Sequence, residues 1–167
     1  MVLTTSELVL ALQHEVRILL HLASKLDPSM LDYRPTPGQR STIDLLRYLT
    51  VMGPELLRSI KAGAFDVPAW TAAETSAKAR DFEATLATLA SHGDIYAKEL
   101  GGMEDADFRS EIEMFGSRAS RGSMIVNVVL CGCAAYRTQL FLYLKACGRS
   151  ELGTTNLWAG MDAPPKA

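Results

Sequence analysis

Residues 123–148 read SMIVNVVLCGCAAYRTQLFLYLKACG, and this stretch decides the fold. It is long enough for about seven helical turns at 3.6 residues per turn. It starts with Ser, ends with Gly and contains no Pro. It is apolar around most of its circumference, and a helix of that kind belongs in the middle of a helical bundle. We therefore predict a long, largely buried helix over Ser123–Gly148.

The whole chain has the composition of a soluble globular protein. Its 167 residues are 48% apolar and 22% charged, with a net charge of -2, and this length favours a single domain over residues 1–167. The small net charge gives no electrostatic reason to expect nucleic acid or an acidic membrane surface as a partner. The apolar run Met124–Ala135 is interrupted by Asn127 and is too short to span a bilayer. We therefore expect neither nucleic acid nor a membrane as a partner.

The cysteines and the N-terminus indicate a cellular compartment. Three cysteines are embedded in helical pattern, and an odd number in such a setting favours reduced thiols over a disulfide framework. The first residues also lack the basic-then-apolar layout of a signal peptide. Both features predict a cytoplasmic protein.

Two amphipathic helices are predicted in the first third of the chain. Thr4 and Glu7 match a capping box, so the first helix should begin near Thr4, and it should end before Pro28 because the residue before a proline avoids helical geometry. Ser41 is the predicted N-cap of the second helix. Pro54 should kink or split that helix, since it cannot donate to the preceding turn.

The middle of the chain is less regular. We predict a loop over 61–70 and a third helix over 71–100 with Thr71 as a candidate cap. Within residues 101–122, Phe108, Ile112 and Met114 alternate with charged residues, which indicates a short extended piece within a longer crossover. After the last helix, Leu157 and Trp158 are expected to dock on the bundle.

The sequence resembles a known family of helical bundles. Tyr136-Arg137-Thr138-Gln139-Leu140, followed by Tyr143-Leu144 and Gly148, resembles the last long helix of the DinB/YfiT-like metal-binding proteins, where the segment usually reads His-x-x-x-His-Arg-Gly-Gln-Leu. Residues 31–49 resemble that family's Arg-Pro-x-x-Gly-x-x-Ser turn and the Leu-Leu-x-His helix after it, and residues 157–160 resemble its tail. The resemblance implies an all-α four-helix bundle of up-down-down-up topology, with a longer crossover between the third and fourth helices.

The resemblance also implies three metal-binding histidines, one from the second helix and two from the last. In this sequence those positions hold Tyr48, Gly132 and Tyr136. Glycine offers no donor atom, and a phenol with a pKa of about 10 must lose its proton to bind a divalent ion well. We therefore predict no metal and no cofactor. The two tyrosines are expected to fill the former site and to hydrogen-bond each other or a water molecule.

Four further polar side chains are candidates to line a pocket, namely His14, His21, Arg137 and Gln139. His14 and His21 share one face of the first helix, but seven residues of helical rise separate them by about 10 Å, too far for one metal ion. Either of them could still face the bundle interior. For Arg137 we expect an acidic partner across the helices, and for Gln139 a buried polar partner. A pocket-lining role is the alternative for both.

The remaining histidine and the cysteines point to structural roles. His92 stands beside Gly93 and is predicted to be a surface residue. Cys131 and Cys133 point roughly 200° apart on a helix, so they can neither clamp one ion nor bridge each other.

Two functions are compatible with these residues. The first is a non-catalytic or small-ligand-binding protein that keeps the scaffold and has lost the metal. The alternative is a metal-dependent thiol transferase or isomerase, an activity that the resemblance implies, with a shifted site built from His14 or His21. The apolar surplus on the first and last helices predicts a homodimer in either case.

Overall fold

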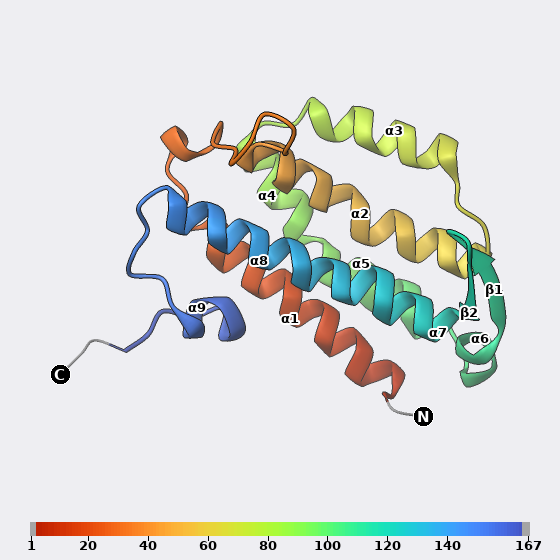
Figure 1. The fold of residues 1–167 in the computed structure, drawn as a ribbon. Helices are drawn as coiled ribbons and strands as arrows, with labels where there is room; N and C mark the ends of the chain where they lie inside the picture. Colours follow the sequence, from red (N-terminus) through yellow and green to blue (C-terminus); the bar gives the residue numbers. More distant parts are fainter. Residues whose placement is uncertain (1–2, 165–167) are drawn as a thin grey trace.

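The structure is a computed structural model that describes residues 3–164, and it is helical apart from one short hairpin (Figure 1). In chain order the elements are α1 (Thr5–Ala23), η1 (Pro28–Met30), α2 (Thr42–Ala62), α3 (Val67–Lys78), α4 (Phe82–Ala90), α5 (His92–Gly101), α6 (Asp105–Arg109), β1 (Glu111–Met114), β2 (Ser117–Ser120), α7 (Arg121–Met124), η2 (Ile125–Leu130), α8 (Cys131–Ala146) and α9 (Thr154–Ala159).

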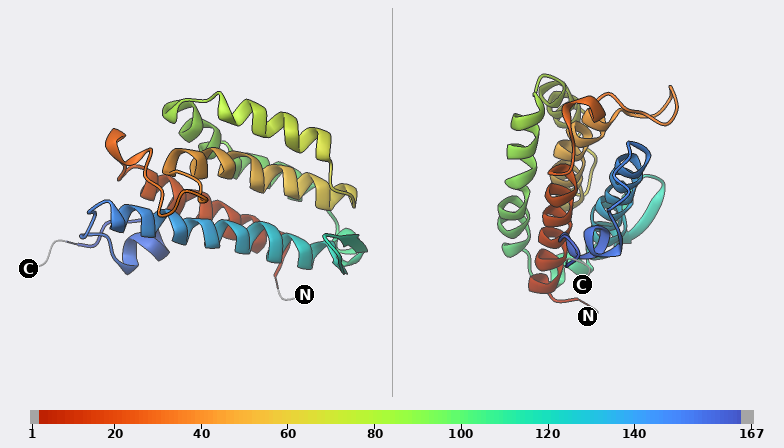
Figure 2. Two further views of the ribbon diagram at one scale, coloured as in Figure 1. Left: turned by 45° about the horizontal axis from the view of Figure 1, so that its top comes forward. Right: turned by 90° about the vertical axis from the view of Figure 1, so that its left-hand side faces the viewer.

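The bundle consists of four long helical segments, namely α1, α2, the α4–α5 pair and α8. Helix α1 packs against α5 and α8, and α2 packs against the same two neighbours from the other side. In Figures 1 and 2, α1 and α8 run in one direction, while α2 and the α4–α5 pair run in the other. This is the predicted up-down-down-up arrangement. Helix α3 returns along the outside of α2 and so connects α2 to the α4–α5 pair, which runs parallel to it.

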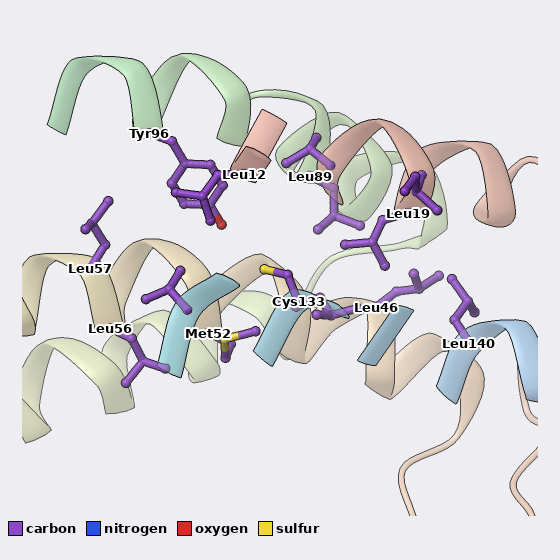
Figure 3. Packing of buried hydrophobic residues seen from close by; sticks show 14 of the residues in the cluster. Leu12, Leu19, Leu46, Met52, Leu56, Leu57, Leu89, Tyr96, Cys133 and Leu140 are labelled. Carbon is purple, nitrogen blue, oxygen red and sulfur yellow. The ribbon is translucent and has the colours of Figure 1, made fainter. Parts of the chain in front are cut away.

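Leucine side chains fill the space between the bundle helices (Figure 3). Leu12 on α1, Leu46 and Leu57 on α2, and Leu140 on α8 are completely buried. Each side chain of this kind contributes about 1.5–3 kcal/mol when it leaves water. The three- and four-residue spacing of apolar residues within each helix therefore sets which face turns inward.

The predicted helix starts are confirmed. The Thr4 backbone N–H donates to the Glu7 carboxylate at 2.7 Å, and the Glu7 N–H donates to the Thr4 hydroxyl at 3.2 Å. The Ser41 hydroxyl accepts from the Asp44 N–H at 3.3 Å. Helix α2 continues through Pro54, so the predicted split does not occur. Pro54 is buried, and packing on both sides compensates for the single hydrogen bond that proline removes.

The prediction of one helix over 71–100 is wrong. The chain forms α3, α4 and α5 instead, and α3 starts at Val67, inside the predicted loop. Asp66 and Asp81 each accept a hydrogen bond from the backbone N–H three residues later and so cap α3 and α4. An aspartate in that position starts a new helix, whereas the apolar pattern continues across the break. Thr71 is not a cap, because its hydroxyl donates to the Val67 carbonyl within α3.

The corner between α3 and α4 is held from α2. The Arg47 guanidinium donates to the Arg80 carbonyl oxygen at 2.9 and 2.6 Å. The Arg80 side chain in turn donates to the Thr50 hydroxyl at 3.0 Å. These contacts fix α3 against the outer face of α2, where it covers part of the candidate site described below.

The crossover from α5 to α7 contains the predicted extended piece. Strands β1 and β2 pair antiparallel, with Glu111 opposite Ser120 and Met114 opposite Ser117. The Arg121 guanidinium donates to the Ile60 carbonyl at 3.1 Å and so attaches this hairpin to the end of α2.

The last helix is less regular than its sequence predicts, and it begins and ends two residues earlier. It begins at Arg121, where the Ser120 hydroxyl accepts from the Ser123 N–H, and its second segment, η2, is π-helical. The whole helix Arg121–Ala146 has 26 residues and is largely apolar. By length and composition alone it could cross a membrane, a test that the core helix of a soluble protein also passes. The absence of a membrane partner therefore stays a prediction. In the structure it packs along α1 and α2.

Candidate functional site

Helices α2 and α8 bring Tyr48 and Tyr136 together. Their ring centroids are 5.1 Å apart, and the rings meet edge to face at 68°. Trp70 of α3 lies against the other side of Tyr48, with centroids 6.1 Å apart. The Arg40 guanidinium lies 3.8 Å above the Tyr48 ring. We call these four residues the aromatic cluster. Such ring pairs and stacked cations stabilise by roughly 0.5–1.5 kcal/mol each.

Gly132, the third position to which the family resemblance assigns a metal ligand, faces Met52. A Cβ atom built on Gly132 would lie 3.3 Å from the Met52 Cε and 3.4 Å from its Sδ. Met52 is completely buried on α2, so its side chain occupies the space into which a longer residue at Gly132 would extend. A histidine at this position would have to displace that thioether.

The electrostatics of the aromatic cluster disfavour a metal ligand. Burial of the Tyr48 phenol raises its pKa far above the usual value, and the neighbouring Tyr136 hydroxyl raises it further. The Arg40 charge opposes these effects without cancelling them. At neutral pH the phenol keeps its proton, and a protonated phenol is a poor ligand for a divalent ion.

A small cavity of about 210 Å³ lies beside Tyr48, between α2 and α3. Its lining carries both signs of charge, with Arg40, Arg47 and Lys78 opposite Asp44 and Glu74. The aromatic ring and these charges could hold only a small molecule, because the volume is below that of most drug-sized sites.

A second polar region crosses the bundle interior. The Arg137 guanidinium of α8 donates to the Glu15 carboxylate of α1 at 3.0 Å, and both side chains are at least nine-tenths buried. Within residues 3–164, one polar atom of each remains without a partner, Oε2 of Glu15 and Nε of Arg137. Burial raises the pKa of the Glu15 carboxyl, and the Arg137 charge opposes this. Arg137 thus has the acidic partner expected across the helices.

Cys133 and Tyr96 extend this region toward α5. Burial, reinforced by the Glu15 charge, raises the pKa of the Cys133 thiol to about 12. Figure 3 shows the Cys133 sulfur and the Tyr96 hydroxyl in the interior between the helices. A Cβ atom on Gly53 of α2 would lie 1.9 Å from the Tyr96 hydroxyl oxygen. Only glycine at position 53 leaves room for that phenol, and Cys133 remains an unreactive thiol.

His92 completes the region, and its predicted surface position is wrong. The side chain is 2% exposed, its ring meets the Tyr96 ring edge to face, and burial lowers its pKa to about 4. Within the described residues Nε2 has no partner. His92, Tyr96 and Leu100 are spaced four residues apart, and this spacing could have identified the inward face of α5. We call Glu15, Arg137, Cys133, Tyr96 and His92 the buried polar line.

The structure does not bring His14 and His21 to the aromatic cluster. His14 Nε2 lies 2.9 Å from the Trp158 carbonyl oxygen, and His21 Nε2 lies 3.0 Å from the Asn156 side-chain nitrogen. Both histidines therefore attach the C-terminal segment to α1. The Trp158 ring itself lies 5.1 Å from the Arg137 guanidinium and so closes the outer end of the buried polar line.

Gln139 also lies apart from Tyr48. Its amide donates to the Tyr143 hydroxyl at 2.5 Å, and that hydroxyl donates to the Arg40 carbonyl at 3.0 Å. This chain holds the loop before α2 against α8, so Gln139 positions the backbone of the residue whose guanidinium covers Tyr48. Across residues 3–164, no three His, Cys, Asp or Glu side chains lie close enough together to hold a metal ion.

Comparison with known proteins supports the fold. The structure is similar to the crystal structure of the DinB-like protein YjoA of Bacillus subtilis, with a TM-score of 0.66 and 16% sequence identity over 87% of this chain and 95% of that one. The fold is DinB-like. No protein-family model and no curated protein matches the sequence. At this level of identity, the likeness to YjoA establishes the DinB-like fold alone.

Proposed function

We propose that this protein is a non-catalytic, small-ligand-binding protein on a DinB-like fold, in which side chains have replaced the metal centre. One observation carries the proposal: Tyr48 and Tyr136 pack edge to face at 5.1 Å. The resemblance to the DinB family assigns metal ligands to these two positions and to Gly132. The space that an ion would occupy between these three positions is therefore filled by two aromatic rings and by the Met52 side chain.

The chemistry of these groups supports the loss of the metal. Neither phenol is a thiolate, an imidazole or a carboxylate, which are the donors that zinc and nickel prefer. The raised pKa of Tyr48 keeps its proton in place at neutral pH. The small charged cavity beside Tyr48 supports the ligand-binding part of the proposal, because ring and guanidinium faces there are accessible to a small molecule.

Metal analysis of the purified protein tests the proposal. We expect no stoichiometric transition metal in the natural chain. Rebuilding the triad with Tyr48→His, Gly132→His and Tyr136→His, together with Met52→Ala to make room, should create a zinc site. The variant Tyr48→His with Tyr136→His is the matched control, because it offers only two imidazoles. A stoichiometric metal in the natural chain would overturn the proposal.

The alternative of a metal-dependent thiol transferase or isomerase receives no support from the histidines that it requires. His14 and His21 are hydrogen-bonded to the C-terminal segment, and they lie on α1, away from the aromatic cluster.

We also propose that the chain forms a homodimer. Leu10 on α1 is 64% exposed and Leu142 on α8 is 58% exposed, which leaves apolar surface on both helices for a second copy to cover. Light scattering coupled to size exclusion should return twice the chain mass. A monomer at high concentration would contradict the proposal.

A further inference from the structure

A cavity of about 480 Å³ lies where α1 begins, beside α6, α7 and η2. Its volume is within the range of small-molecule sites, roughly 300–1,000 Å³. Its lining shares no residue with the cavity beside Tyr48. Leu8, Phe108 and Val126 supply apolar walls, and Thr5, Ser123 and Asn127 supply polar groups. An apolar pocket with a few convergent polar groups is the usual form of a ligand site.

The helix that forms one wall is itself unusual. Val126 and Asn127 belong to η2, the π-helical segment Ile125–Leu130. Such segments are rare, and they occur frequently at functional sites because they cost more than regular α-helix. Asn127 is also the only polar residue between Met124 and Cys131. Nothing in the proposed function uses this asparagine or the π-helical backbone.

The charges of the lining define the ligand. Among the residues that the structure describes, Arg109 is the one charged residue of the lining. Its side chain is 70% exposed and pairs with Asp105 at 3.6 Å. The Asn127 amide nitrogen donates to the Ser123 hydroxyl at 3.2 Å. Among the described residues, the Asn127 amide oxygen and the Thr5 hydroxyl have no hydrogen-bond partner. The site thus offers neutral hydrogen-bonding groups, and its one cation already has an acidic partner.

We propose that this cavity binds a neutral amphiphile that carries a hydroxyl group, an alcohol or a phenol. Its apolar body lies against Leu8, Phe108 and Val126, and its hydroxyl exchanges hydrogen bonds with Asn127 and Thr5. A hydroxyl suits these groups because it both donates and accepts. A carboxylate of the same size would lose hydration without gaining an unpaired cation, so it binds at least tenfold more weakly.

The ligand class is tested by titrating the isotope-labelled full chain and monitoring its amide chemical shifts. The probes are benzyl alcohol, benzoate and toluene, which share one ring and differ in the polar group. We expect saturable shifts at residues 5–8, 108 and 120–127, with benzyl alcohol at least tenfold tighter than benzoate. Equal affinity for the alcohol and the carboxylate, or shifts confined to other parts of the bundle, would overturn the proposal.

Two substitutions test the place of binding. Val126→Trp fills the cavity and should weaken benzyl alcohol at least tenfold, whereas the matched control Val128→Trp, half-buried on the same segment but outside the lining, should leave binding unchanged. Unaltered binding to Val126→Trp would overturn the proposal.

The exposed Asn127 offers a variant that does not load the core. Asn127→Leu should weaken benzyl alcohol about fivefold, the usual worth of one hydrogen bond, and should leave toluene unchanged. If both tryptophan variants lose binding through misfolding, the comparison of benzyl alcohol with toluene on Asn127→Leu still tests binding in this cavity. Equal losses for the alcohol and for toluene would contradict a hydroxyl contact at Asn127.

Discussion

The aromatic cluster and the buried polar line are both built across facing helices, but they differ in what water can reach. Tyr48 and Tyr136 are half-buried and meet by their rings, whereas the buried polar line holds a carboxylate, a guanidinium and an imidazole within the core. The aromatic cluster contains two positions, Tyr48 and Tyr136, to which the sequence resemblance assigns metal ligands. The buried polar line contains no such position.

The difference teaches that the match of a position to a family motif and its contribution to stability are separate properties of a fold. A half-exposed phenol can exchange its partner for water, so its hydroxyl contributes little to stability. A buried charge without its partner cannot do so and costs several kcal/mol. We therefore expect substitutions in the buried polar line to have larger effects than substitutions in the aromatic cluster.

Arg137→Met should have the largest effect. It leaves the Glu15 carboxylate buried without its partner and should lower the free energy of unfolding by about 3–5 kcal/mol, measured by urea denaturation at neutral pH. The double variant Glu15→Leu with Arg137→Met should recover most of this loss. Arg58→Met, which breaks a partly exposed ion pair with Glu55, should cost no more than about 1 kcal/mol. Similar losses for the two arginines would contradict the comparison.

His92 should make the free energy of unfolding depend on pH. Its pKa is lowered to about 4 in the folded protein, so between pH 6.5 and 4 the unfolded chain binds a proton that the folded chain does not. Stability from the neutral imidazole is therefore complete above pH 6.5 and falls with acidification, by about 3 kcal/mol at pH 4.

The measurement for His92 is the difference between the natural chain and His92→Phe over that pH range. The raised pKa of Glu15 acts in the opposite direction and the lowered pKa of His21 in the same direction, and both are common to the two proteins. Parallel stability curves for the two proteins would show that His92 is not the group that titrates.

Gly53→Ala should lower the free energy of unfolding by about 2 kcal/mol, because the new methyl group meets the Tyr96 hydroxyl and overpacks the core. Tyr96→Phe in the same chain should restore part of the loss, since the nearest remaining ring carbon is 3.1 Å away. The matched control is Gly93→Ala on α5, whose new methyl would lie 3.6 Å from Gln13. That substitution should stabilise the helix by up to about 1 kcal/mol.

Hydroxyl deletion gives the smallest effect and compares the two regions directly. Tyr136→Phe in the aromatic cluster should cost about 0.5 kcal/mol, whereas Tyr96→Phe in the buried polar line should cost about 1.5 kcal/mol. Thermal or urea unfolding of the two variants measures the difference. A larger loss at Tyr136 would mean that its hydroxyl has a stronger partner than the Tyr48 ring.

Local signals in the sequence predicted much of the bundle. Thr4 and Ser41 cap α1 and α2 as expected, because a capping side chain bonds the backbone N–H groups of its own first turn. The period of the apolar residues predicted the inward faces, since it depends only on the pitch of the helix. The resemblance located Tyr48 and Tyr136, and the structure places them in contact. The caps and the apolar period depend only on residues that are close together in the sequence, so the sequence alone predicts them.

Tertiary structure alone decided the rest. The break at Asp81 was hidden because the apolar pattern continues across it. The spacing of His92, Tyr96 and Leu100 marks one face of α5, but only packing against α1 and α2 buries that face. Glu15 and Arg137 are 122 residues apart in sequence, and no local pattern says which acid an arginine will meet. Caps and periodicity arise from neighbouring peptide groups, whereas charge pairing and pKa values arise from whichever helix faces are packed together.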